Sequence, residues 1–261
     1  MVCDLAEASA TQQCLSEIKP DAVIHAQALS DVDQCERDPA QADVMNRQTV
    51  AHLCCALELQ RESRPWLIAV STDYVFDGTK GRPYHEEDLP HPVSVYGRSK
   101  FAGERAVLDY GRGVVVRLST LFGPGHANFC DTIVQRFRRG ESVEAFADQT
   151  TSPTYTADVA GALPQLLRAL ASRDQARTPR MYHLTNAGAC TRVEFATHVA
   201  GLMGYDGSLI RVIAMNDQRR PAPRPAYSAL TSRYLRDMLG RTLRPWQEAV
   251  SEYLASQGWR N

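Results

Sequence analysis

The sequence predicts an α/β fold built on a doubly wound parallel sheet. Three short, mostly apolar runs at 21–25, 66–70 and 114–118 have the composition of strands that are buried on both faces. Segments in which apolar residues recur at helical spacing lie between these runs. This alternation is typical of parallel sheets that are covered by helices on both sides.

The expected helices follow from this spacing and from their end signals. The first covers 4–19 and ends at Pro20, and a second begins at Asp38-Pro39 and runs through Asn46 to Leu57. Thr191 and Glu194 form a capping-box pattern at the start of another helix. Further helices are expected after 94 and at 131–140, 158–170, 231–239 and 245–256, with a further strand at 182–184.

Bulk composition excludes several function classes. The 261 residues are 44% hydrophobic and carry a net charge of −1, which gives no electrostatic basis for binding nucleic acid or a membrane surface. No apolar run approaches the roughly 20 residues of a membrane span, and the amino end has no signal-peptide pattern. The seven cysteines lack metal-type spacing. We expect a cytoplasmic protein with free thiols and no metal site.

Polar residues follow the strand at 66–70 directly. Ser71, Thr72 and Asp73 come at its carboxyl end, which is the edge where open α/β sheets bind their ligands. Thr72 could therefore offer its hydroxyl to a substrate oxygen. A Ser-Thr pair at such a point more often forms a turn or a cap, so this pair alone predicts little.

Tyr96 and Lys100 are four residues apart and lie on one face of the predicted helix. An ammonium beside a phenol favours the phenolate and makes the tyrosine useful as a general acid or base. Tyr-x-x-x-Lys is common, and on its own the ordinary interpretation is a solvated surface pair. A buried strand, a hydroxyl and this pair in close succession form a much rarer combination, which indicates a catalytic site.

Several motifs together resemble one family. The chain resembles the extended short-chain dehydrogenases/reductases, and within them the dTDP-4-dehydrorhamnose reductase branch. The matching segments are 20–28, 32–36 with Asn46, 71–78 (Ser-Thr-Asp-Tyr-Val-Phe-Asp-Gly), 96–100, 148–154, 182–184, and Arg224-Pro225 with Ser228. The segment 71–78 is specific to this branch, whereas Tyr-x-x-x-Lys is general to the superfamily.

The resemblance implies two units with interleaved chain segments. Residues 1–145 would form a Rossmann-type NAD(P)-binding domain, and 146–261 mainly a smaller C-terminal α/β lobe that binds substrate. The sequence contains no Gly-rich pyrophosphate motif, so we expect the sheet to lack its first β-α-β portion. The chain is then either an N-terminal truncation or a protein with weak dinucleotide affinity.

The resemblance also assigns the site residues. The cofactor would be NADPH or NADH, and a Thr72/Tyr96/Lys100 triad would be catalytic. The position of Thr120 resembles a site where this branch has a Trp that lines the sugar pocket. Replacing that Trp by Thr would remove an apolar wall, so the sugar can differ from the family's standard one. The implied cofactor contacts are Asp4, Leu5, Ala26, Gln27, Ala28, Tyr96 and Lys100, and the implied substrate contacts are Asp73, Val75, Phe76, Asn128 and Arg224. Asn128 as a helix cap and Arg224 as a surface linker residue are the alternatives.

The implied activity is NAD(P)H-dependent reduction of a 4-keto nucleotide-linked deoxysugar, as in dTDP-rhamnose biosynthesis. The substrate partner would be a nucleotide sugar, and a homodimer is compatible with the family. Three alternatives remain open at this point. They are a related sugar-nucleotide epimerase or dehydratase, a non-catalytic subunit similar to the methionine adenosyltransferase beta subunit, and a truncated product without stable function.

Overall fold

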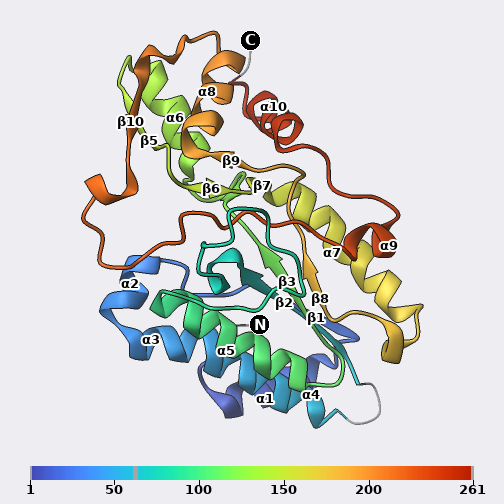
Figure 1. The fold of residues 1–261 in the computed structure, drawn as a ribbon. Coiled ribbons are helices and arrows are strands. Elements are labelled where there is room, and N and C mark those ends of the chain that lie inside the picture. The colour runs from blue at the N-terminus through green and yellow to red at the C-terminus, as the bar shows by residue number, and fades with distance from the viewer. Residues whose placement is uncertain (1, 61–63, 260–261) are drawn as a thin grey trace.

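A parallel sheet forms the centre of the molecule, in a computed structural model that describes residues 2–60 and 64–259. Its strands are β1 (Ala22–His25), β2 (Trp66–Thr72), β3 (Gly113–Leu118) and β8 (Met181–His183). They lie in the order β1-β2-β3-β8, and every neighbouring pair is parallel (Figure 1). The α/β class predicted from the sequence is confirmed.

Helices cover both faces of this sheet because alternate strand residues point to opposite sides. On one face, Leu67 and Val115 pack with α1 (Ala8–Ile18), α4 (Thr49–Glu58) and α5 (Val95–Asp109). On the other face, Ile68 and Val116 pack with α7 (Thr156–Ala171) and α9 (Leu235–Leu239). The central strands are therefore buried on both sides, as their composition predicts.

The predicted helix from Asp38 to Leu57 is interrupted. It consists of α3 (Pro39–Asp43), a π-helical turn (Val44–Gln48) and α4, and it follows the short helix α2 (Val32–Arg37). Asn46 lies in the π turn, where its amide bonds both backbone groups of Leu29 and the Ser99 hydroxyl. This turn consequently ties the loop after β1 to α5.

Two glycines allow α5 to approach its neighbours closely. A Cβ on Gly97 would lie 2.2 Å from the carbonyl oxygen of Tyr74, and one on Gly103 would lie 2.5 Å from that of Asn46. Ser94 begins the helix by accepting a hydrogen bond from the Gly97 amide. This packing presses Tyr96 against the segment that follows β2.

A second core lies in an α/β lobe at the other end of the molecule (Figure 1). Phe137, Phe195, Trp246 and Tyr253 are buried in it. Its capping box of Thr191 and Glu194 is confirmed. The lobe contains α6 (Phe129–Arg138), α8 (Arg192–Leu202), α10 (Trp246–Ser256), the parallel pair β5 (Val143–Phe146) and β10 (Ile210–Ile213), and the short pairs β4 (Leu121–Phe122) with β7 (Thr154–Tyr155) and β6 (Thr150–Thr151) with β9 (Cys190–Thr191).

The boundary expected near residue 145 does not separate the two cores. Helix α6 precedes it but belongs to the lobe, strand β5 of the lobe spans it, and α7 and β8 follow it but pack in or against the sheet. The chain passes between the two cores more often than a single boundary allows. Among the described residues, no helix is long and apolar enough to cross a membrane.

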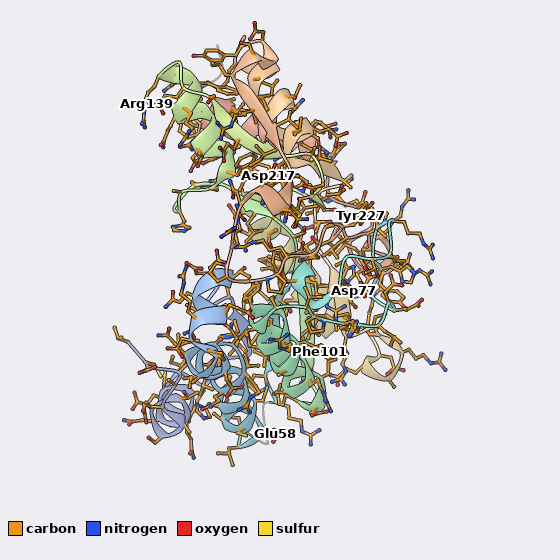
Figure 2. The ribbon with its side chains drawn as sticks, turned by 60° about the vertical axis from the view of Figure 1, so that its left-hand side comes forward. Glu58, Asp77, Phe101, Arg139, Asp217 and Tyr227 are labelled. Atoms are coloured by element: carbon orange, nitrogen blue, oxygen red, sulfur yellow. The ribbon has the colours of Figure 1, made fainter. Side chains whose placement is uncertain are left out.

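Residues 218–234, which we name the crossing segment, run from the lobe back to α9 (Figure 1). Tyr227 bridges to Thr150, and Leu230 bridges to Tyr84. Pro225 packs so closely on Gly78 that a Cβ there would lie 2.7 Å from the proline ring. Asp77 and Tyr227 lie on the same side of the molecule in Figure 2. The crossing segment therefore lies beside the carboxyl end of β2.

Candidate active site

The structure brings the predicted triad to the carboxyl end of β2. Thr72 ends the strand and is 7% exposed, and the turn Asp73–Val75 follows it. The Tyr96 ring, half-buried at the start of α5, meets the ring of Tyr74 edge-on at a centroid distance of 5.7 Å. The Thr72 hydroxyl is within hydrogen-bonding reach of the Tyr96 phenol.

Lys100 occupies a different position from the one predicted. Its Nζ donates to the carbonyl oxygen of Val70 at 2.8 Å, inside the angle between α5 and β2. Burial lowers the pKa of Lys100 to about 8, and the charge of Glu104 opposes this shift. Lys100 is not among the main influences on the Tyr96 phenol. The expected lowering of the tyrosine pKa by Lys100 is therefore absent from this arrangement, because the ammonium is bound to the strand.

Burial is the largest effect on Tyr96, and it raises the pKa of the phenol above its ordinary value. The nearby Thr72 hydroxyl lowers this pKa, whereas the negative charge of Asp73 raises it further. The net result is a phenol that keeps its proton. That state suits a general acid, which must hold a proton before it can donate one.

Glu104 lies one helical turn beyond Lys100, in a closed ion pair. It accepts two hydrogen bonds from Arg117, at 2.8 and 2.6 Å, and one from Ser71 at 2.6 Å. All of these side chains are nearly inaccessible to solvent. The pair fixes α5 against β2 and β3 and so sets the height of Lys100 above the sheet.

The end of β1 carries the residues predicted to contact the nicotinamide end of a dinucleotide. His25 is buried, its Nε2 has no hydrogen-bond partner, and burial together with the charge of Lys100 lowers its pKa to about 4. Ala26 and Gln27 then follow exposed, and Ala28 is half-buried. Since Nε2 has no partner among the described residues, it can hydrogen-bond a ligand there, and the cofactor contacts at 26–28 stay a prediction.

The two residues expected near adenine lie just before α1. Asp4 is exposed and accepts a bond from the Ala6 amide. The Leu5 side chain packs on the core under α4, while its carbonyl contacts His52 Nδ1 at 3.0 Å. Leu5 could therefore meet a ligand through its backbone only.

The three residues expected to face the sugar are buried. Asp73 is 3% exposed and accepts hydrogen bonds from Thr72, Ser119 and Ser228. Val75 and Phe76 have no exposed surface and pack with Tyr84 and Leu230. This placement corrects the prediction, since the turn after β2 directs these side chains into the protein.

Asn128 and Arg224 already have protein partners. Asn128 caps α6 in a capping box with Asp131, and its amide also donates to Gly123. Arg224 forms two hydrogen bonds with Asp33, at 3.0 and 2.9 Å. The capping alternative for Asn128 is confirmed, and Arg224 joins the crossing segment to α2.

A cleft that the sequence did not reveal opens beside Tyr74. We name it the arginine cleft; it comprises two adjoining cavities of about 420 and 170 Å³. Arg220 lines both cavities, and Arg192 lines the smaller one. In the described part of the chain, neither guanidinium forms an ion pair with a carboxylate. Other residues of the lining include Tyr74, Phe129, Phe146, Gln149, Gln218, Arg224 and Glu144, whose carboxylate is paired with Arg211.

The backbone beside this site is strained at Thr120. Its φ of 28° lies in the left-handed region, which costs a non-glycine residue about 1–3 kcal/mol. Its carbonyl accepts a hydrogen bond from Thr154, and the preceding Ser119 binds Asp73. The hydrogen bonds of Thr154 to Thr120 and of Ser119 to Asp73 hold the strained turn in place.

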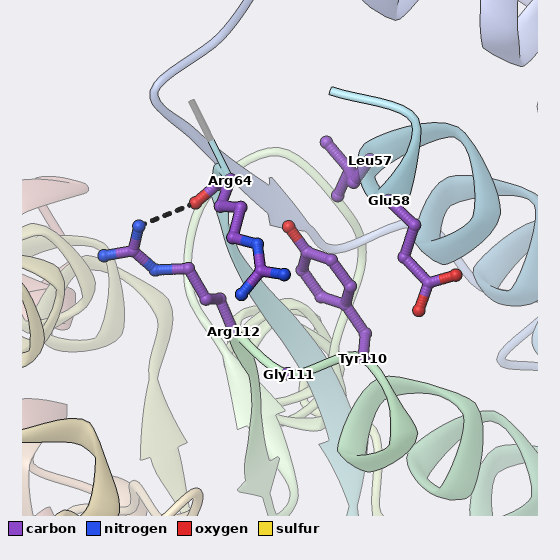
Figure 3. A pocket seen from close by; sticks show the side chains of 6 residues that line it. All are labelled: Leu57, Glu58, Arg64, Tyr110, Gly111 and Arg112. Atoms are coloured by element: carbon purple, nitrogen blue, oxygen red, sulfur yellow. Dashed lines mark hydrogen bonds between the residues drawn. The ribbon is translucent and has the colours of Figure 1, made fainter. Parts of the chain in front are cut away.

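A further cavity of about 430 Å³ lies at the amino ends of β2 and β3 (Figure 3). Arg64, Tyr110 and Arg112 line it, and Arg112 donates to the carbonyl of Arg64 at 2.9 Å. The triad lies at the opposite ends of the strands, so this cavity is separate from the candidate active site.

Comparisons with known proteins agree with the fold. Residues 2–258 match the family described as the RmlD substrate binding domain. The chain is 35% identical to the dTDP-4-dehydrorhamnose reductase of Streptomyces griseus, over 95% of this chain and 81% of that protein. It is 32% identical to the spore coat polysaccharide biosynthesis protein SpsK of Bacillus subtilis, over 96% and 84%. The chain belongs to the RmlD substrate binding domain family.

Solved structures are similar over nearly the whole chain. The dTDP-4-dehydrorhamnose reductase of Bacillus anthracis, in complex with NADP, superimposes with a TM-score of 0.88 at 29% identity, over 97% of this chain and 87% of that one. A dTDP-glucose 4,6-dehydratase of Streptomyces venezuelae has a TM-score of 0.78 at 19% identity, which shows a shared fold only. The family resemblance predicted from the motifs is confirmed.

Proposed function

We propose that this protein is an NADPH-dependent reductase of a 4-keto deoxysugar linked to a nucleoside diphosphate. The observation that carries the proposal is the position of Tyr96, whose ring contacts Tyr74 at the wall of the arginine cleft. The relatives named dTDP-4-dehydrorhamnose reductase, and the similar structure in complex with NADP, support this choice of substrate class and cofactor.

The arginine cleft has the chemistry of a diphosphate site. Guanidinium groups bind phosphate oxygens through paired, charge-assisted hydrogen bonds. Burial lowers the pKa of Arg192 and of Arg220, and the charge of Arg220 further disfavours the charge on Arg192. An anionic ligand between them would relieve this repulsion. The flanking rings of Phe129 and Phe146, each already stacked on one of these arginines, give flat apolar surface for a base or a sugar.

The protein groups would then act in sequence on the ketone. NADPH supplies the hydride when it is bound. Tyr96 donates its proton to the oxygen that becomes an alcohol. Thr72 stabilises charge on that oxygen once its hydroxyl hydrogen turns from Asp73 toward it. Lys100 and His25 hold polar groups of the cofactor, which enters between β1 and α5. The half-buried position of Tyr96 keeps bulk water from competing for the proton.

An assay with NADPH and a dTDP-linked 4-keto-6-deoxysugar tests the proposal, with loss of NADPH absorbance and the alcohol product as readouts. We expect Tyr96→Phe to lower kcat by about 10²–10⁴-fold, the usual range for loss of a general acid. Binding of dTDP should remain unchanged. Tyr205→Phe is the matched control, because Tyr205 packs on Phe137 within the lobe.

Two results would count against this function. If Tyr96→Phe reduces the sugar as fast as the native chain, Tyr96 is not the acid. If the native chain binds dTDP but shows no turnover and no binding of NADPH, the site binds nucleotide sugars without reducing them. Calorimetric titration with NADPH and dTDP separately distinguishes these two cases.

A further inference from the structure

Asp73 has a full set of hydrogen bonds that the proposed reaction does not use. One carboxylate oxygen, Oδ2, accepts from Ser119 at 2.9 Å and from Ser228. The other, Oδ1, accepts from Thr72 Oγ1 at 3.2 Å. The carboxylate is 3% exposed, so its partners are these hydroxyl groups and not water. They come from three separate parts of the chain.

A threonine hydroxyl has one hydrogen and can donate only one hydrogen bond. The backbone amide of Tyr74 donates to Thr72 Oγ1 at 3.2 Å and occupies one lone pair. If the single hydrogen points to Asp73, it cannot also point to the oxygen of Tyr96. Asp73 and Tyr96 therefore compete for the same hydrogen.

We propose that Asp73 is a positioning residue that draws the Thr72 hydroxyl hydrogen away from Tyr96 and so keeps the proton on the tyrosine. The proposal rests on the proposed function, in which Tyr96 must hold a proton before the ketone arrives. Asp73 acts in two ways. It removes a donor that would stabilise the phenolate, and its own negative charge disfavours a second negative charge nearby.

The other groups around Tyr96 do not duplicate this role. Tyr74 and the Cys35 thiol also act on the phenol, but burial raises the pKa of both. They stay neutral in the range where an enzyme works. Arg192 faces Asp73 from the lobe and stays charged, since an arginine does not lose its proton at such pH. Burial also raises the pKa of Asp73, but hydrogen bonds from Ser228, Ser119 and Thr72 oppose that rise. Asp73 is thus the group among the main influences on Tyr96 whose negative charge has hydrogen-bond donors to stabilise it.

Ser119 and Ser228 explain why an amide cannot replace the carboxylate. Both serines donate to Oδ2, so an asparagine at 73 would turn its carbonyl oxygen toward them. Its NH₂ group would then face Thr72 and donate to Oγ1. Thr72 would accept instead of donate, and its hydrogen would be free to bind the oxygen of Tyr96. Asp73→Asn thereby reverses the hydrogen bond with almost no change of shape.

The test is an NMR titration of tyrosine ring carbons in the protein without substrate or cofactor, with the Tyr96 resonance assigned from Tyr96→Phe. We expect Asp73→Asn to raise the phenolate fraction of Tyr96 at pH 11 by about threefold or more, the equivalent of half a pKa unit. In a Thr72→Val background the same substitution should raise it clearly less, because no hydroxyl hydrogen is left to redirect. Asp77→Asn, a neighbouring carboxylate that binds Tyr84, should leave it unchanged.

Two outcomes would overturn the proposal. One is an equal rise in both backgrounds, which would mean that only the charge of Asp73 acts. The other is a fall in the phenolate fraction in Thr72→Val alone, which would mean that Thr72 already donates to Tyr96 in the native protein. The second result decides the matter even if Asp73→Asn does not fold. Neither readout needs reductase activity, so failure of the proposed function remains a separate result.

Discussion

Two arginines of this protein are both withdrawn from water but have opposite surroundings. Arg117 is 1% exposed, lies over the ring of Phe76 and forms two hydrogen bonds with Glu104. Arg192 lies over the ring of Phe129 at the wall of the arginine cleft. One charge is neutralised within the protein, and the other is left for a ligand.

The difference shows how burial of a charge separates structure from function. A buried guanidinium loses its hydration, and a carboxylate partner offsets this cost only when the geometry is good. Glu104 offers such geometry to Arg117. The cleft offers Arg192 a cation–π contact and no carboxylate partner among the described residues. We expect substitutions at the first pair to change stability and those at the second arginine to change ligand affinity.

The largest effect is expected when the closed pair is broken. Glu104→Gln leaves Arg117 buried without a counter-charge, which should lower the free energy of unfolding by about 3–5 kcal/mol. Urea denaturation measures it. Glu141→Gln is the control, since Glu141 is exposed and 3.9 Å from Arg139, and it should change stability by less than about 0.5 kcal/mol. A loss below 1 kcal/mol for Glu104→Gln would contradict the assignment.

A smaller effect, on affinity, is expected in the cleft. Arg192→Met should weaken dTDP binding by about 10–100-fold, because hydrogen bonds to charged groups contribute roughly 1.5–3 kcal/mol. Stability should not fall, since an uncompensated charge is removed. Calorimetry on the variant and on Arg168→Met, an exposed arginine of α7, measures the difference. Equal affinity in the two variants would rule out a role for Arg192 in ligand binding.

Substitution in the Arg224–Asp33 ion pair should have the smallest effect on stability. The burial of this pair is intermediate between that of the Arg117–Glu104 pair and that of a surface pair. Their side chains are 11% and 23% exposed, and the hydrogen bond from Arg224 lowers the pKa of Asp33. A carboxyl with a depressed folded pKa adds stability above its unfolded pKa of about 3.9, and this stability is lost as pH falls through the folded pKa. Arg224→Met should therefore cost about 0.2–1 kcal/mol at pH 7 and almost nothing near pH 2. A pH-independent difference in urea midpoints would argue against the ion pair.

Local patterns allowed the sequence to predict the triad and the strands. Tyr96 and Lys100 meet on one helix face by spacing alone, and Thr72 lies at the end of a recognisable strand. Helix caps at Thr191 and Asn128 are equally local. The predictions of these elements needed only neighbours in sequence. The structure confirms the strands and the caps and brings Thr72 and Tyr96 together, whereas the Lys100 ammonium binds the Val70 carbonyl instead of the tyrosine.

What the sequence could not predict depends on distant partners. Arg192 and Arg220 come together from α8 and the crossing segment, and nothing in either segment marks a shared cleft. Glu86 reads as part of a solvated acidic loop, yet it is buried and accepts hydrogen bonds from the amides of His183 and Arg233. Likewise Asp73 faces inward because Ser119 and Ser228 donate hydrogen bonds to its carboxylate there. Such placements follow from tertiary contacts alone.

The bond between Ser228 and Asp73 also has a consequence for synthesis of the chain. Ser228 follows Tyr96 by 132 residues, so at roughly 5–20 residues per second a ribosome adds it about 7–26 s later. During that interval the nascent sheet can already hold Thr72, Tyr96 and Lys100, but the hydroxyl network around Asp73 is incomplete. The hydrogen bonds of Asp73 beside Tyr96 are therefore complete only after the crossing segment has left the ribosome and packed against the sheet.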